Sequence, residues 1–160
     1  MKQTYKIFFA ILAVMASLCF IVLAGQIFTH LYLGAEDSEG IRDFFRDDIV
    51  VKGLTSPLAM LTILIPWIAA AMYYYVVNSV HFDRWWHWGI VLILTGLATF
   101  YSSWQFMSSH LVLENNDGAY SPYILSLAGW CALLSGGAYL LASYGIRWWS
   151  SNCRHTPIPQ

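Results

Sequence analysis

The sequence predicts an all-helical, polytopic membrane protein, with four transmembrane helices in an antiparallel bundle and one short amphipathic helix outside the membrane. Two observations predict this fold class. The chain contains four apolar segments of about 20 residues or more, the length at which a helix crosses a hydrocarbon core of about 30 Å. None of these segments contains Asp, Glu, Lys or Arg. The predicted spans are 7–28, 57–80, 88–107 and 122–146.

The composition places the whole chain, residues 1–160, in a single membrane domain. Only 11% of the residues are charged, whereas soluble domains carry about 25%. The charged residues lie in the gaps and tails between the apolar segments. The longest gap, 29–56, is too short to form an independent hydrophobic core. We therefore expect no separate soluble domain.

The first predicted span, 7–28, follows two basic residues, Lys2 and Lys6, as the apolar region of a signal peptide would. Its apolar run is longer than that of a typical signal peptide, and no clear small-residue cleavage site follows it. We therefore expect an uncleaved helix. The small residues of this span that can pack against a neighbouring helix are Ala10, Ala13 and Ser17.

The segment 40–52 predicts an amphipathic helix on the outer membrane surface or docked on the bundle. Its apolar face consists of Ile41, Phe44, Phe45 and Ile49. Arg42, Asp43, Arg46 and Asp47 lie largely on the other face, while Asp48 interrupts the apolar one. Gly53 is expected to end this helix. Because its charges are mixed, we expect no simple electrostatic lipid anchor, and one hypothesis is that it docks a partner.

The second predicted span, 57–80, begins with Pro57 and contains Pro66 near its middle. Proline removes a backbone donor and pushes on the preceding turn, so the sequence predicts a kink at Pro66. Such a kink serves helix packing, or it forms a hinge or a bend in a pore.

The third and fourth predicted spans, 88–107 and 122–146, carry small residues at regular helical spacing. Ala128, Ala132 and Gly136 recur every fourth residue in the fourth span, and Gly96 and Ser103 lie seven residues apart in the third. Small residues at such spacing let two helix backbones approach closely. The contacts are either within one bundle or between protomers, and the sequence does not separate these alternatives.

The basic residues near the span ends predict that both termini are cytoplasmic, because Lys and Arg favour that side. With this threading the inner side holds Lys2, Lys6, Arg84, Arg147 and Arg154, and the outer side holds Arg42, Arg46 and Lys52. Tryptophans at the predicted inner interface agree with it: Trp85, Trp86, Trp88, Trp148 and Trp149. The layout is similar to that of small four-span bacterial inner-membrane proteins in general, and we expect that location.

The sequence contains no convincing catalytic, metal or nucleic-acid site, and we expect no enzyme. Of the three cysteines, Cys19 and Cys131 fall within spans and Cys153 falls in the tail, which argues against a disulfide framework. An active transporter generally needs ionisable residues within the membrane, and the predicted spans contain none of the acidic or strongly basic kind. The polar run after 108 lacks the carboxylates of a calcium loop.

Two histidines, His30 and His110, fall near the outer ends of their predicted helices at similar depth. Two facing histidines in a four-helix membrane bundle can ligate a haem iron, so they are weak candidates for a haem b site. The preferred expectation is that they are interfacial and that the protein holds no cofactor.

These observations favour a non-catalytic membrane subunit, or an accessory or assembly protein, of a larger membrane complex. Its expected partners are the lipid bilayer and either other membrane-protein subunits or further copies of itself. One alternative is a homo-oligomeric channel or pore, suggested by Pro66 and by the hydroxyls of Thr95, Thr99, Ser102 and Ser103. A second alternative is a haem- or quinone-binding redox subunit, suggested by the histidines and tryptophans.

Overall fold

The computed structural model describes residues 3–31, 33, 40–77, 84–112, 119–147 and 150. This part of the chain is all-helical and contains no strand. In order, the elements are α1 (Gln3–His30), α2 (Ile41–Val51), α3 (Thr55–Ala71), α4 (Trp85–Met107) and α5 (Ser121–Ile146). Two π-helical segments continue α3 and α4 directly, η1 (Met72–Val77) and η3 (Ser108–Val112).

In the part of the chain that the structure describes, four helices are long enough and apolar enough to cross a membrane, which is consistent with an integral membrane protein and with the four predicted spans. The bounds differ from the apolar runs. The helix of α1 begins before the predicted start, and α4 begins at Trp85 and continues through η3. A helix can begin before the first apolar residue and end after the last one, because its backbone hydrogen bonds do not require apolar side chains. Residues 78–80 of the second predicted span lie outside the described chain.

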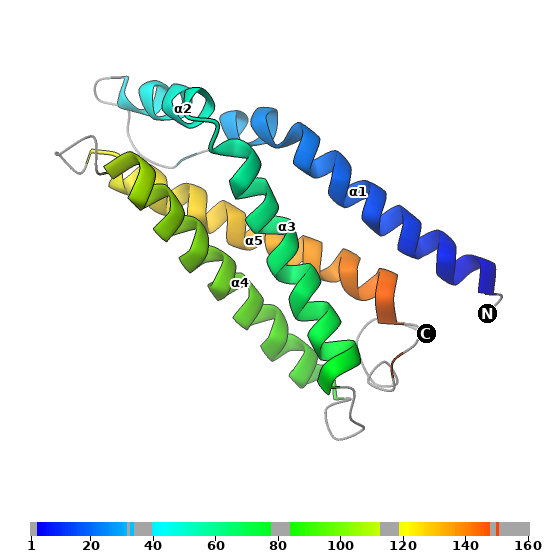
Figure 1. The fold of residues 1–160 in the computed structure, drawn as a ribbon. Coiled ribbons are helices and arrows are strands. Elements are labelled where there is room, and N and C mark those ends of the chain that lie inside the picture. Colours follow the sequence, from blue (N-terminus) through cyan, green and yellow to red (C-terminus); the bar gives the residue numbers. More distant parts are fainter. Residues whose placement is uncertain are drawn as a thin grey trace.

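Helix α5 lies at the centre of the packing and contacts α1, α3 and α4 (Figure 1). Helix α1 packs against α3 and α5 only through part of its surface, and its other side is apolar and exposed, with Val22 82% exposed. Large apolar side chains exposed all along a helix are stable in lipid and costly in water. This surface fits the bilayer as its solvent.

Buried side chains form two clusters, one toward each end of the molecule. The larger cluster joins α2 to the end of α1, the end of α4 and the start of α5, and it includes Phe28, Phe45, Met107 and Tyr123. We call this the α2 end. The smaller cluster, at the opposite end, consists of Ala70, Tyr73, Tyr74, Trp88, Tyr139 and Ala142.

The link from α2 to α3 is a tight turn at Gly53, the residue predicted to end the helix. Gly53 has a φ of +64°, a left-handed conformation that residues with a Cβ rarely adopt. The amide of Gly53 donates to the carbonyl of Val50 and that of Leu54 to the carbonyl of Ile49, at 3.0 and 2.9 Å. These bonds satisfy carbonyls at the end of α2 and turn the chain into α3.

Candidate functional site

Helix α2 and the residue that follows it, Lys52, are held against the ends of the long helices by hydrogen bonds and ring contacts. Arg46 donates from Nη2 to the carbonyl oxygen of Leu31, just beyond α1, at 3.0 Å. Lys52 donates from Nζ to the carbonyl oxygen of His110 in η3, at 3.3 Å. The Phe45 side chain is fully buried and lies against the rings of Tyr120 and Tyr123, with centroids 5.4 and 5.7 Å apart. These contacts fix the orientation of α2.

The fourth attachment of α2 explains why Asp48 interrupts its apolar face. The Tyr120 hydroxyl donates to Asp48 Oδ2 at 3.0 Å. The pKa of Tyr120 is raised to about 12, chiefly by burial and additionally by the hydrogen bond to Asp48 and the negative charge of Asp48. The Asp48 carboxylate, which interrupts the predicted apolar face of α2, therefore accepts a hydrogen bond from a buried tyrosine.

The other side of α2 carries an exposed apolar ridge. Phe44 is 65% exposed and Val51 is 83% exposed, and Asp47 lies exposed between them at helical spacing. We call these three residues the outward face of α2. Of the predicted apolar face, Phe45 and Ile49 are buried and Ile41 is half-buried, but Phe44 points away from the core. The reason is that Phe44 lies about 100° around the helix from Phe45, so one bundle contact cannot cover both.

The regularly spaced small residues lie where α4 and α5 pack together. Ala128 and Ser103 are fully buried. A Cβ added at Gly96 would lie 3.9 Å from the carbonyl oxygen of Ala132, and one added at Gly136 would lie 3.8 Å from a methyl carbon of Leu92. These residues therefore face partners inside the chain. Whether protomers also associate stays a prediction.

A three-helix junction joins α1, α3 and α5, and sequence reasoning did not find it. The Ser17 hydroxyl donates to the Ala13 carbonyl at 2.9 Å and accepts from Trp67 Nε1 at 3.0 Å. A Cβ added at Gly145 would lie 3.2 Å from the Cβ of Ala13 and 3.6 Å from the Cα of Ala10. Gly145 belongs to no repeat, so only the Ala10, Ala13 and Ser17 series hinted at this contact.

Pro66 is buried inside α3, which continues past it to Ala71 before changing to the π-helix η1. A π-helical segment makes i→i+5 bonds and widens the helix locally. Two of its tyrosines, Tyr73 and Tyr74, are buried. The hinge and pore interpretations of Pro66 stay predictions.

The weak haem candidates His30 and His110 are both exposed rather than enclosed between helices. His110 Nδ1 lies 2.8 Å from the carbonyl oxygen of Phe106 and 3.0 Å from Ser109 Oγ, both within its own helix. Among the described residues, no group of three or more His, Cys, Asp and Glu side chains is placed to hold a metal ion. Cys19 is exposed and Cys131 is buried, both as free thiols, while Cys153 lies outside the described residues.

Comparison with known proteins gives no family: no family model matches the chain, and no curated protein or solved structure is significantly similar to it.

Proposed function

We propose that this protein is a non-catalytic integral membrane subunit, or an accessory or assembly protein, of a larger membrane complex. In this proposal α1, α3, α4 and α5 cross a bacterial inner membrane as an antiparallel bundle with both termini cytoplasmic. Helix α2 then lies at the outer surface. Three hydrogen bonds between the ends of different elements support the antiparallel arrangement: Arg46 to Leu31, Lys52 to His110, and Tyr75 Oη to the carbonyl of Ile146 at 2.7 Å.

The outward face of α2 is the observation that carries the proposal. The opposite side of α2 is attached to the bundle by four contacts, and these hold in place the helix that carries Phe44 and Val51. Apolar side chains that are held rigidly and exposed outside the hydrocarbon region are typical of protein contact sites. In a membrane subunit such a face binds another subunit without any chemistry of its own.

The charge of this face indicates the kind of partner. Asp47 lies exposed within the ridge. Asp43 lies beside it and forms ion pairs with Arg46 at 3.6 Å and with Arg42 at 3.9 Å, so its charge is compensated. Anionic lipid headgroups would repel the Asp47 carboxylate, whereas a protein surface with an apolar pocket and a basic group at its rim would complement it. We therefore favour a protein partner over the membrane surface for this face.

The test compares two matched double variants in the native membrane. Phe44→Ala/Val51→Ala removes the ridge of α2, while Phe8→Ala/Val22→Ala removes the same residue types from α1, where their exposure is 59% and 82%. The proposal predicts that the native complex loses its partner chains in the α2 variant and keeps them in the α1 variant. Equal retention of the partner chains in both variants would count against the docking face.

The structure shows where the residues lie that suggested the two alternative functions, a pore and a haem-binding subunit. Thr95, Thr99 and Ser103, which suggested a pore lining, are buried inside the single chain. The hydroxyls of Thr95 and Thr99 donate to the carbonyls of Val91 and Thr95 in their own helix. A channel between protomers would therefore need other polar residues, and a haem between His30 and His110 would lack the enclosure that such sites usually have.

A further inference from the structure

The outward face of α2 contains one charged residue, Asp47, and it points directly away from the bundle. Successive residues of a helix are about 100° apart around its axis. At that spacing Asp47 lies opposite the midpoint between Phe45 and Ile49, the two buried residues of α2. Phe44 and Val51 lie beside it and are 65% and 83% exposed. A carboxylate is therefore presented next to an apolar ridge.

Asp47 differs from the other two carboxylates of α2 in having no partner among the described residues. Asp48 accepts the hydrogen bond described above, and Asp43 pairs with Arg46 at 3.6 Å and with Arg42 at 3.9 Å. No hydrogen bond or ion pair involves the Asp47 side chain in the part of the chain that the structure describes. Its negative charge is therefore available to a partner.

A second copy of this chain does not match the outward face. Helix α2 lies across the end of the bundle, because it is attached at the ends of α1, α4 and α5. Two copies in one membrane are related by an axis along the membrane normal, which would make a symmetric pair of α2 helices antiparallel. Phe44 would then face Val51 of the other copy, and the two Asp47 carboxylates would meet between them. Like charges placed in this way are strongly unfavourable.

A ring of copies would not supply a cation to Asp47 either. The Lys and Arg residues that the structure describes at this end of the molecule are Arg42, Arg46 and Lys52, and each already interacts within its own chain. Arg42 and Arg46 pair with Asp43, and Arg46 and Lys52 donate to backbone carbonyls. The group that complements Asp47 must therefore come from a different protein.

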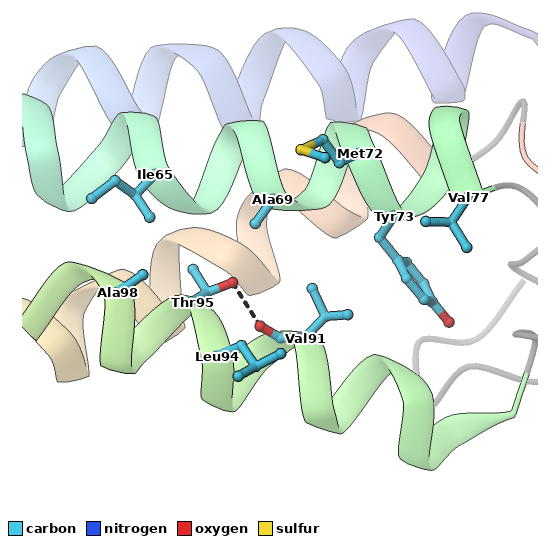
Figure 2. A pocket seen from close by; sticks show the side chains of 9 residues that line it. All are labelled: Ile65, Ala69, Met72, Tyr73, Val77, Val91, Leu94, Thr95 and Ala98. Atoms are coloured by element: carbon cyan, nitrogen blue, oxygen red, sulfur yellow. Dashed lines mark hydrogen bonds between the residues drawn. The ribbon is translucent and has the colours of Figure 1, made fainter.

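The cavity between α3, η1 and α4 offers no comparable basis for identifying an occupant (Figure 2). Its volume is about 310 Å³, and its lining residues carry no charge. The Thr95 hydroxyl donates to the Val91 carbonyl at 2.6 Å, so it is satisfied within α4. Apolar walls alone do not distinguish one apolar occupant from another. The outward face of α2, in contrast, combines an apolar ridge with a charge.

We propose that the outward face of α2 binds a foreign protein chain, in an apolar groove that carries a lysine or arginine opposite Asp47. Phe44 and Val51 are seven residues apart, which is the spacing of successive anchors on a helix that lies in a groove. Apolar contact at these anchors supplies affinity, and the cation selects the partner. This inference deepens the proposed function and rests on it, because it specifies the chemistry of the chain that α2 docks.

The first experiment compares complexes that are purified gently from native membranes and washed at one fixed salt concentration. Asp47→Asn and Asp43→Asn each remove one negative charge from α2, one helical turn apart, but only Asp47 is without a partner in its own chain. Asp47→Asn should lower the amount of foreign chain per tagged protein at least about tenfold, and Asp47→Lys should lower it further, because close charge pairs at interfaces are strongly coupled. Asp43→Asn should keep most of it. Helicity and elution volume equal to those of the wild type identify the folded variants.

A charge exchange then tests the contact itself. A photoreactive amino acid in place of Val50, which is 51% exposed and one turn from Asp47, identifies the partner segment that covers the face. The basic residues of that segment are changed to glutamate one at a time. One of these changes should weaken binding to the wild-type chain and restore binding to Asp47→Lys. A purely structural role of Asp47 would not produce this rescue.

Three results would overturn the inference. Equal losses of the foreign chain from Asp47→Asn and Asp43→Asn would mean that only the total charge of α2 matters. Full retention by Asp47→Lys, together with loss from Phe44→Ala/Val51→Ala, would keep the docking face but remove the cation. Disulfide dimers formed by Asp47→Cys, in a background without other cysteines, would place a second copy on the face. The absence of any foreign chain from the wild-type complex would instead overturn the proposed function itself.

Discussion

The hydroxyl of Tyr120, at the start of α5, donates a 3.0 Å hydrogen bond to the carboxylate of Asp48 on α2. This bond joins residues that are 72 positions apart in the chain. It places a charged residue of α2 against the bundle and leaves Phe44 and Val51 outside. The orientation of the proposed docking face thus depends on this pair together with Arg46 and Lys52.

The Tyr120–Asp48 pair predicts a loss of stability at high pH. The pKa of Tyr120 is raised from 10.0 to about 12. Between these values the folded chain keeps a proton that the unfolded chain has lost, so the free energy of unfolding falls as pH rises from about 10 to about 12. Below pH 10 the contribution is complete. Thermal unfolding in detergent across this range should show the loss, and Tyr120→Phe should remove this part of it.

At neutral pH, Tyr120→Phe should lower the free energy of unfolding by about 1.5–3 kcal/mol, because it removes a hydrogen bond to a charged group. Tyr5→Phe, at a tyrosine that is 57% exposed, is the matched control. Identical unfolding midpoints for the two variants would show that the bond contributes nothing to stability.

The contact between α1 and α5 predicts a specific sensitivity at Gly145. Its added Cβ would lie 3.2 Å from the Cβ of Ala13, a short side chain that cannot move aside. Gly145→Ala should therefore destabilise the protein by about 1–3 kcal/mol. Gly137→Ala meets no atom within 4 Å and should be tolerated. Combining Gly145→Ala with Ala13→Gly should restore much of the lost stability; no recovery would mean that the two helices do not cross here.

The hydrogen bond between Trp67 and Ser17 predicts an energetic coupling between α3 and α1. A double-mutant cycle with Ser17→Ala and Trp67→Phe measures it. Interhelical hydrogen bonds in membranes average about 0.6 kcal/mol and reach about 1.7 kcal/mol, and we expect a coupling in this range. A coupling energy of zero would mean that these two side chains do not interact.

The proposed threading predicts opposite accessibility for two exposed positions. In a cysteine-free background, Asp47→Cys on α2 should react with a membrane-impermeant maleimide added to intact cells whose outer membrane has been made permeable. Trp85→Cys, at a residue that is 67% exposed, should react only after the inner membrane is opened. The reverse pattern would invert the orientation, and reaction of both positions from one side would contradict the bundle.

The sequence predicted the parts of the fold that depend on length, apolarity and turn chemistry. Four uncharged apolar runs predicted four long helices, and a helical apolar pattern with Gly53 at its end predicted the helix now seen over Ile41–Val51. These features depend on local properties of the chain. The outer location of α2, the antiparallel threading and the function stay predictions.

The candidate surfaces depended on distant contacts, which no local pattern reveals. Asp48 interrupts the predicted apolar face of α2, and the hydrogen bond that it accepts comes from Tyr120, a residue distant in the sequence. The helical spacing assigned Phe44 and Phe45 to the same face, although only Phe45 is buried. Gly145 is not part of a repeat of small residues, so the sequence did not indicate its contact with Ala13.

The composition of the native complex tests the central claim most directly. The tagged protein would be extracted gently from its own membranes, its complex sized, and every co-purifying chain identified and quantified. The account predicts stoichiometric foreign membrane subunits, which are lost from the Phe44→Ala/Val51→Ala variant and kept by Phe8→Ala/Val22→Ala. A pure homo-oligomer of the wild-type chain would contradict it and would make conductance in bilayers the next measurement.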